Sequence, residues 1–261
     1  VVEDNWGDPV SATRLEDALK DNPDASIVAF VHAETSTGAL SDAKTLCKVA
    51  RKYNCITIVD AVTSLGGVEL LVDEWEIDAI YSGSQKCLSA MPGISPISFG
   101  ERAVAKLSKR KTPVTSWFLD LTLVMGYWGE GAKRSYHHTA PVNTLYGLHE
   151  SLLMIREEGI ENSWFRHQQN HQKLRDGLES MGIKFLVKAE SRLPQLNTVI
   201  IPDGIDDADV RNRLLNEYNL EIGAGLGAYA GKVWRIGLMG YASRNENVTL
   251  CLSALNDVLR K

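Results

Sequence analysis

The sequence predicts an α/β fold, with a large domain built on a mostly parallel sheet and a smaller α+β domain after it. Two observations lead to this prediction. Strand-like apolar runs alternate with amphipathic helical stretches up to about residue 140, and long helices with shorter strands then follow. Such alternation is typical of parallel sheets, because a crossover helix returns the chain to the edge where the next strand begins. We therefore expect two domains, over residues 1–160 and 161–261.

The composition limits the class of protein before any motif is considered. The 261 residues are 44% hydrophobic and carry a net charge of −5, so the chain is long enough to bury a large core. Charges of both signs are mixed, and no basic stripe is present to bind phosphate backbones. The apolar runs, such as residues 27–31, are shorter than the roughly 18 residues of a membrane span. We expect small-molecule ligands, no nucleic acid and no membrane insertion.

The first half of the chain is predicted to form a sheet with helices on both faces. A turn at residues 7–9 precedes a first helix, and a second helix has its apolar residues on one face between residues 46 and 53. The expected strands are β-branched or apolar and cover residues 27–31, 55–59, 79–81 and 97–99.

The second half is predicted to be richer in helix. Long helices are expected from residue 142 to Gly159 and from residue 162 to 181, with a further helix at 207–218. Shorter strands are expected at residues 184–187, 197–201 and 233–238. Ser243 and Glu246 have the spacing of a capping box, which predicts the start of a C-terminal helix.

The cysteines and histidines give no metal or disulfide pattern. The four cysteines, Cys47, Cys55, Cys87 and Cys251, form no CxxC pair, so we expect reduced thiols in an intracellular protein, whether cytoplasmic, peroxisomal or mitochondrial. His167 and His171 are four residues apart on a predicted helix, but the stretch between them lacks the glutamate of a zincin motif. We expect no metal site.

An aspartate and a lysine suggest cofactor chemistry. Asp60 follows the predicted strand 55–59, and ligands of parallel sheets bind outside the carboxyl ends of the strands. Lys86 ends the small-residue stretch S82-G83-S84-Q85-K86, and a desolvated lysine amine is suited to Schiff-base chemistry. Pyridoxal phosphate needs a lysine for its aldehyde and an acid for its ring nitrogen. Taken singly, each residue also fits an ordinary surface role, as an aspartate that ends a strand and a lysine in a loop of small residues.

Five motifs in order resemble those of class V aminotransferases, above all the alanine–glyoxylate (serine–pyruvate) type. They are V59–G67, Y81–K86, P92–S95, Y136–T139, and G225–G227 together with W234–G237. The resemblance implies the fold-type-I architecture, with a large sheet domain and a small C-terminal domain. It also implies pyridoxal 5′-phosphate as cofactor and a homodimer with active sites at the subunit interface.

The resemblance assigns four residues to the cofactor ring. Lys86 is similar to the lysine that binds the cofactor aldehyde and then moves a proton between the substrate Cα and the cofactor. Asp60 is similar to the partner of the pyridine nitrogen. Val62 resembles the apolar residue packed on one ring face, although an ordinary core position fits it equally well. Thr35 stands where a hydroxyl bonds the cofactor's phenolic oxygen.

Four further residues are assigned to the cofactor phosphate and the substrate. Gln85, Tyr136 and Thr139 resemble phosphate ligands, the latter two reaching the cofactor of the neighbouring subunit. Alternatively, the stretch Y136–T139 only caps the helix that follows. Arg235 resembles the clamp for the substrate α-carboxylate, a task suited to a planar guanidinium.

Two stretches depart from a simple interpretation. Residues 223–227 look like a phosphate cradle, but they do not join a strand to a helix, so we expect a turn that leads to Arg235. Members of the family carry a further N-terminal segment with a phosphate loop and a ring-stacking aromatic residue. Neither is found here, so we expect the chain to be N-terminally incomplete, with weaker cofactor anchorage.

The resemblance implies transamination between a small amino acid, alanine or serine, and a small 2-oxo acid, glyoxylate or pyruvate. A cysteine desulfurase-like lyase of the same fold is the first alternative, and Gln85 disfavours it because those enzymes carry a histidine before the lysine. The second alternative is an inactive remnant that only folds or dimerises.

Overall fold

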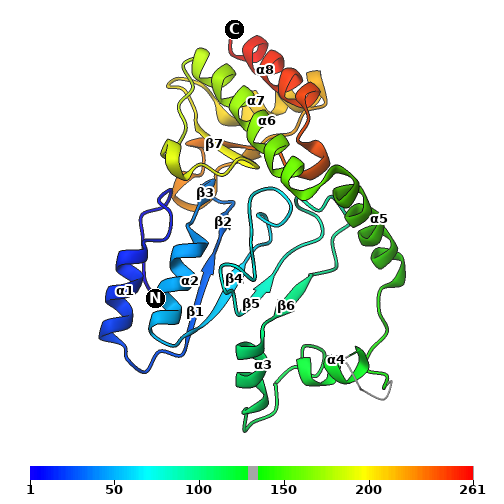
Figure 1. Cartoon of the computed structure of the whole chain (residues 1–261). Coiled ribbons are helices and arrows are strands. Elements are labelled where there is room, and N and C mark those ends of the chain that lie inside the picture. Colours follow the sequence, from blue (N-terminus) through cyan, green and yellow to red (C-terminus); the bar gives the residue numbers. More distant parts are fainter. Residues whose placement is uncertain (129–134, 261) are drawn as a thin grey trace.

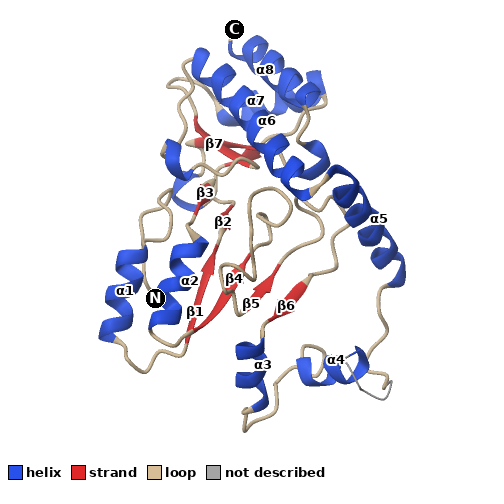
Figure 2. Cartoon of the chain, viewed as in Figure 1, coloured by secondary structure: helices blue, strands red, loops and turns tan. Residues whose placement is uncertain are grey.

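Two sheets organise the molecule, whose computed structural model describes residues 1–128 and 135–260 (Figures 1 and 2). The first has the strand order β1-β4-β5-β6, the second the order β7-β9-β8, and β2 pairs with β3 alone. The strands are β1 (Ile27–Val31), β2 (Ala33–Glu34), β3 (Ala39–Leu40), β4 (Ile56–Asp60), β5 (Ala79–Tyr81), β6 (Ile97–Phe99), β7 (Leu196–Ile200), β8 (Gly223–Ala224) and β9 (Val233–Gly237).

Helices cover parts of both sheets. The α-helices are α1 (Ala12–Asp21), α2 (Ala43–Lys52), α3 (Glu101–Ser108), α4 (Leu121–Trp128), α5 (Val142–Glu158), α6 (Ile160–Ser180), α7 (Asp207–Tyr218) and α8 (Asn245–Leu259). Three short 3₁₀ helices are η1 (Ala189–Ser191), η2 (Gly227–Tyr229) and η3 (Gly240–Ala242).

The first sheet is mostly parallel, as the sequence predicts. β1 pairs with β4 and β4 with β5 in parallel register, whereas β6 is antiparallel to β5. A parallel neighbour needs a crossover that returns the chain to the starting edge. β6 follows the loop 82–96 and enters the sheet from the opposite end, as an antiparallel edge strand.

Helices α1 and α2 cover one face of this sheet. On that face, Leu15 and Leu19 of α1 pack with Leu46 and Ala50 of α2 against Val28 of β1. The side chain of Asp42 begins α2 by accepting a hydrogen bond from the Thr45 backbone N–H at 3.0 Å. These contacts bury the strand residues that point toward the two helices.

The opposite face is largely open, so the expected second helical layer is wrong for the described residues. Strand pairing places alternate residues of β1, β4, β5 and β6 on this face. α3 contributes Ala103, which packs with Ile56. Ile27 at 48%, Ile97 at 50% and Phe99 at 42% remain exposed.

The second sheet carries the largest hydrophobic core. Trp234 of β9 is fully buried, and Leu174 of α6, Leu214 of α7 and Leu255 of α8 pack around it. The boundary near residue 160 between the two domains stays a prediction.

Two local predictions in this half are wrong. Residues 184–187 form no strand, because Phe185 makes only an isolated bridge to Val199 before the chain turns into η1. The capping box of Ser243 and Glu246 is absent. α8 begins after Arg244 without a side-chain cap, and the Ser243 hydroxyl accepts a hydrogen bond from Asn170 instead.

The Gly-rich stretch 223–227 also differs from the simple turn that the sequence predicts. Its first two residues form β8, which pairs with β9 opposite Arg235 and Trp234, and the stretch then enters η2. It precedes no α-helix directly, so the geometry of a helix N-terminal phosphate cradle is not formed there.

A buried polar face of α6 connects the two halves of the molecule. Ser163 donates to the backbone oxygen of Gly66 at 2.7 Å. One turn later, His167 lies between the backbone oxygen of Ser163 and the backbone N–H of Gly240. His171 pairs with the side chain of Asn197. Both histidines have protein partners, and the described residues contain no group of three His, Cys, Asp or Glu placed to hold a metal.

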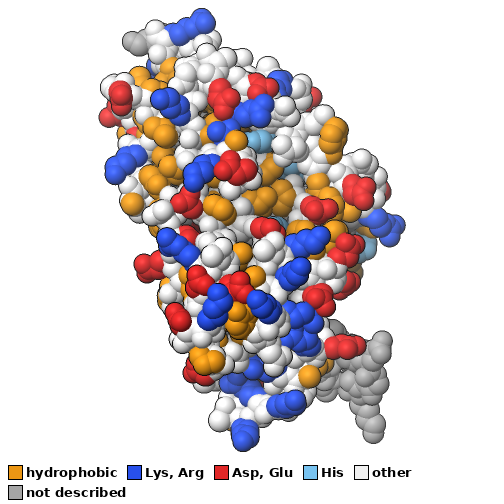
Figure 3. Space-filling model, turned by 60° about the vertical axis from the view of Figure 1, so that its left-hand side comes forward, with side chains coloured by type: hydrophobic (Ala, Val, Ile, Leu, Met, Phe, Trp, Pro, Cys, Tyr) orange, Lys and Arg blue, Asp and Glu red, His pale blue; other side chains and the backbone are white. Residues whose placement is uncertain are grey.

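The outer surface carries both signs of charge. Figure 3 shows basic and acidic side chains interspersed on the face turned forward, with hydrophobic side chains between them. In the part of the chain that the structure describes, no helix has the length and hydropathy to cross a bilayer.

A buried ion pair provides a test of this fold. Asp78 is 3% exposed, accepts from the Thr57 backbone N–H at 3.0 Å and pairs with Arg102 at 3.1 Å. We expect Asp78→Ala to lower the free energy of unfolding by about 2–3 kcal/mol, because it leaves buried donors without a partner. Urea denaturation would measure this. Asp17→Ala, at an exposed pair with Lys20, serves as the control and should change nothing measurable; equal losses in both variants would contradict the prediction.

The buried histidines predict how stability depends on pH. Burial lowers the pKa values of His32 and His167 from 6.5 to about 4. Between about pH 6.5 and pH 4 the unfolded chain therefore binds more protons than the folded chain. The contribution of these histidines to the free energy of unfolding is complete above about pH 6.5 and falls as the pH drops toward 4. Denaturation at several pH values should show this slope. His167→Gln should reduce it, whereas the exposed His149→Asn should not. A flat profile from pH 6.5 to 4.5 would contradict the assignment.

Candidate functional site

Asp60 lies at the carboxyl end of β4, where the sequence places it. Its strand neighbours are Val31 on β1 and Tyr81 on β5. One carboxylate oxygen accepts the backbone N–H of Val62 at 2.9 Å, and the other accepts the phenol of Tyr81 at 2.8 Å. These two bonds fix the plane of the carboxylate at the edge of the sheet.

Tyr81 is a site residue that sequence reasoning missed. The hydrogen bond to Asp60, followed by burial, raises the pKa of the Tyr81 phenol to about 12, so the phenol stays protonated and donates at neutral pH. The signal was present in the pattern: two adjacent parallel strands ending at Asp60 and Tyr81 place both side chains on one sheet face.

Lys86 lies on the loop that follows β5. The loop is closed on itself, since the hydroxyl of Ser84 donates to the Met91 oxygen at 2.5 Å and the Ser89 N–H donates to the Lys86 oxygen at 3.0 Å. Lys86 is partly exposed, and no hydrogen bond or ion pair links its Nζ to another described residue. Its amine is therefore available to a ligand.

Val62 and Gln85 are brought together beside Gly83. A Cβ at Gly83 would lie 2.9 Å from Oε1 of Gln85 and 3.2 Å from Cγ1 of Val62, so both side chains pack directly against this glycine. The loops that follow β4 and β5 thus converge: Asp60 ends β4, Val62 lies on the loop after it, and Gln85 and Lys86 lie on the loop after β5.

Thr35 and Arg235 meet at the same edge from opposite ends of the sequence. Arg235, on β9, donates from Nη1 to the Thr35 backbone oxygen at 3.1 Å and from Nε to the Ala224 oxygen at 2.8 Å. Thr35 follows β2, just beyond the end of β1 that pairs with Asp60. The second sheet therefore delivers a guanidinium to the loops around Asp60.

Tyr136 and Thr139 lie apart from this group. They occupy the segment between α4 and α5, and their hydroxyls hydrogen-bond to each other. Within the described residues, no hydrogen bond joins either of them to Asp60 or Lys86. α5 begins after Pro141 without a side-chain cap, so Thr139 does not cap that helix.

The loop after Asp60 is held by buried groups that the sequence did not reveal. The Thr63 backbone oxygen accepts from both the Cys87 thiol, at 3.2 Å, and the Gln195 amide, at 3.2 Å. Gln195 is fully buried and comes from the segment that leads into β7. Burial raises the pKa of the Cys87 thiol to about 12, so this cysteine is a structural group.

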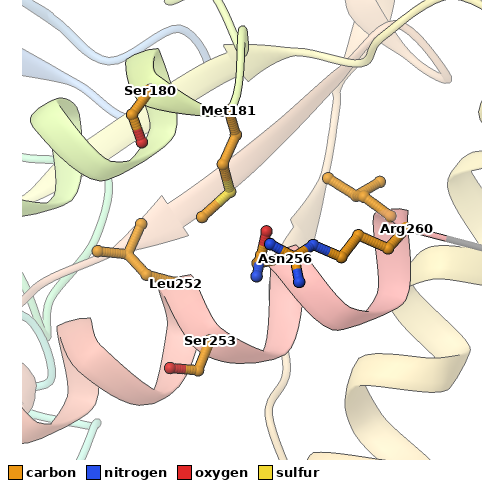
Figure 4. Close-up of a pocket in the computed structure, with 7 residues that line it drawn as sticks. Ser180, Met181, Leu252, Ser253, Asn256 and Arg260 are labelled. Carbon is orange, nitrogen blue, oxygen red and sulfur yellow. The ribbon is translucent and has the colours of Figure 1, made fainter.

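Hollows in the described surface also lie outside this group of residues, among them two of similar size. One, of about 580 Å³, lies behind the Lys86 loop and is lined by Leu88, Ser151 and Tyr241 among others. The other, of about 590 Å³, lies between the end of α6 and α8. Figure 4 shows Met181 pointing toward α8 there. None of the residues that the sequence assigns to the site lines either hollow.

Comparison with known proteins places the chain among aminotransferases. The profile of the family Aminotransferase class-V matches residues 7–249. An alanine–glyoxylate aminotransferase of Rattus norvegicus is 44% identical over 233 residues, which are 88% of this chain and 56% of that protein. An (S)-ureidoglycine–glyoxylate transaminase of Bacillus subtilis (strain 168) is 38% identical over 280 residues, covering 99% of this chain and 66% of that protein.

A solved structure shares the fold closely. The crystal structure of an alanine–glyoxylate aminotransferase from Nostoc sp. superposes with a TM-score of 0.94 at 48% identity, covering 98% of this chain and 67% of that one. The chain spans little more than half the length of the rat protein that it matches. The architecture is that of fold-type-I transferases, and the chain belongs to the class V aminotransferase family.

Proposed function

We propose that the chain carries the cofactor and substrate groups of a pyridoxal-phosphate-dependent aminotransferase. The proposed reaction exchanges an amino group between alanine or serine and glyoxylate or pyruvate. The observation that carries the proposal is the convergence of Asp60, the Lys86 loop and Arg235 at one edge of the sheet. The matched relatives are named for glyoxylate, which supports a small 2-oxo acid as acceptor.

The residues present fit the cofactor. Asp60 offers a fixed carboxylate to a ring nitrogen, and the Lys86 amine has no partner within the described part of the chain. Val62 and Gln85 both pack against Gly83, so an apolar side chain and an amide lie close together on these loops. The exposed Gln85 amide is a donor suited to a phosphate oxygen.

Each residue then has a defined task. When bound, pyridoxal phosphate supplies a ring that accepts the electrons released at the substrate Cα. Asp60 holds the proton on the ring nitrogen, and Tyr81 and the Val62 N–H keep its carboxylate oriented. The Lys86 Nζ would hold the cofactor through its aldehyde carbon, and the same amine would take and return the proton at the substrate Cα.

Arg235 is oriented to bind the substrate carboxylate. Two backbone oxygens occupy its Nε and one hydrogen of Nη1. The remaining hydrogen of Nη1 and both hydrogens of Nη2 make no hydrogen bond to the described residues, and they can form a two-point contact with a carboxylate. Thr35, whose backbone fixes this guanidinium, keeps its hydroxyl for the cofactor's phenolic oxygen.

The alternative functions are a cysteine desulfurase-like lyase and an inactive remnant. A cysteine desulfurase needs an accessible thiol, but all four cysteines are buried, and Gln85 replaces the histidine that such enzymes carry. Product formation that depends on a 2-oxo acid, without sulfide release, would separate transamination from this lyase. An inactive remnant would bind no cofactor.

Lys86→Ala tests the proposal. Wild-type protein mixed with pyridoxal phosphate should gain visible absorbance, and borohydride should remove this absorbance and fix the cofactor on the Lys86 peptide, as mass spectrometry can show. Lys86→Ala should lose both signals and turnover, whereas Lys106→Ala, an exposed lysine on α3, should keep them. Asp60→Asn should retain the Lys86 linkage but lower turnover by about 10²–10³-fold, because a preorganised charge is lost. Unchanged labelling in Lys86→Ala would refute the assignment.

We also propose that two chains share each site, with Tyr136 and Thr139 binding the phosphate held by the partner subunit. Their exposure and their distance in the chain from the Lys86 loop support this. Mixing Lys86→Ala chains with Tyr136→Phe/Thr139→Ala chains should rebuild one site per heterodimer, giving about a quarter of wild-type activity for random pairing. Mixtures no more active than their parents would place all cofactor contacts within one chain.

A further inference from the structure

The Lys86 loop rests on a segment that comes from the other end of the chain. The Ser89 hydroxyl accepts the Tyr241 backbone N–H at 2.8 Å, and Ser89 itself closes the turn that begins at Lys86. A Cβ at Gly240 would lie 2.0 Å from the Ser89 Oγ and 2.7 Å from the Cys87 oxygen. The two segments therefore touch at backbone distance, and no side chain fits at Gly240.

Side chains of α6 hold this segment through the backbone N–H and the backbone oxygen of Gly240. The Gly240 N–H donates to Nε2 of His167 at 2.9 Å, and the Gly240 oxygen accepts from Nη1 of Arg166 at 2.8 Å. Because Nε2 of His167 accepts, its Nδ1 carries the proton and donates to the Ser163 oxygen at 2.7 Å. The ring is fully buried and neutral.

The same segment continues from β9, the strand that carries Arg235. We propose that Arg166 and His167 are positioning residues, which hold the Gly240 segment and thereby fix the Lys86 loop relative to Arg235. Within the described residues, neither side chain hydrogen-bonds to a residue assigned to the cofactor or substrate, and the residue of this segment to which both hydrogen-bond is Gly240. The effect on cofactor binding at Lys86 rests on the proposed function. The contact between the Gly240 segment and the Lys86 loop does not.

Two substitutions of His167 separate positioning from simple packing. A glutamine places its amide oxygen about where Nε2 of the histidine lies, so His167→Gln can still accept from Gly240. An asparagine is shorter and retains only the position of Nδ1, so His167→Asn loses the bond to Gly240. His171→Asn makes the same chemical change one turn further along α6, where the partner is Asn197.

Hydrogen exchange of the cofactor-free protein is the primary measurement. In His167→Asn, amides in residues 86–91 and 239–243 should exchange about tenfold faster, the scale of one lost buried hydrogen bond. His167→Gln and His171→Asn should leave them unchanged, and β4 should be unchanged in every variant. Thermal unfolding checks that each variant is folded. If His167→Asn does not fold, Ser89→Ala takes its place as the test variant. This substitution removes the hydroxyl that accepts the Tyr241 N–H, and Ser89 is exposed.

The outcomes are distinct. Exchange in residues 86–91 that stays at the wild-type rate in folded His167→Asn, or that rises equally in His171→Asn, would overturn the inference. A second measurement, the pyridoxal phosphate concentration needed for half-maximal borohydride labelling of Lys86, should rise in His167→Asn and return toward wild type in His167→Gln. Faster exchange in His167→Asn with no labelling of any variant, wild type included, would keep the coupling and refute the proposed function instead.

Discussion

The parallel register of β1, β4 and β5 is the constraint on which the candidate site depends. It aligns Val31, Asp60 and Tyr81 at one edge, so the loops that leave these strands start side by side. The segments that carry Thr35 and Lys86, distant in sequence, therefore leave the sheet at the same edge. A slip of one residue in β4 would turn Asp60 to the opposite face of the sheet.

The second sheet adds what the first cannot provide. Arg235 reaches the Thr35 loop from β9, and Gln195 reaches the Thr63 loop from the segment before β7. Both contacts bind backbone oxygens of loops that begin at the edge of the first sheet. The cationic side chain is thus set by two backbone acceptors, which orient a guanidinium without neutralising its charge.

Much of the fold followed from local signals in the sequence. The strands around residues 27–31 and 55–59 were predicted because apolar runs of that length fit buried parallel strands, and α5 was predicted to end at Gly159, where the structure ends it. The Asp60 and Lys86 positions followed from strand ends and small-residue loops. These features depend on neighbours in the chain, which a sequence displays directly.

The features that were missed depend on partners far away in the chain. The hydroxyl of Ser243 could cap α8, but it accepts a hydrogen bond from the Asn170 side chain of α6 instead. The bond between Tyr81 and Asp60 depends on the register between β4 and β5. Helical spacing made His167 and His171 look like a possible pair, whereas each histidine is committed to a different backbone or side-chain partner.

Gly67 shows how such long-range contacts limit the ways in which this sequence can change. A Cβ at this position would lie 2.6 Å from the amide nitrogen of Gln195 and 2.7 Å from the sulfur of Cys87. An alanine at position 67 therefore requires a smaller or displaced side chain at 195, which in turn would leave the Thr63 oxygen with one donor fewer. The three positions therefore constrain one another sterically: whether a substitution at 67, 87 or 195 can be accommodated depends on the residues at the other two positions.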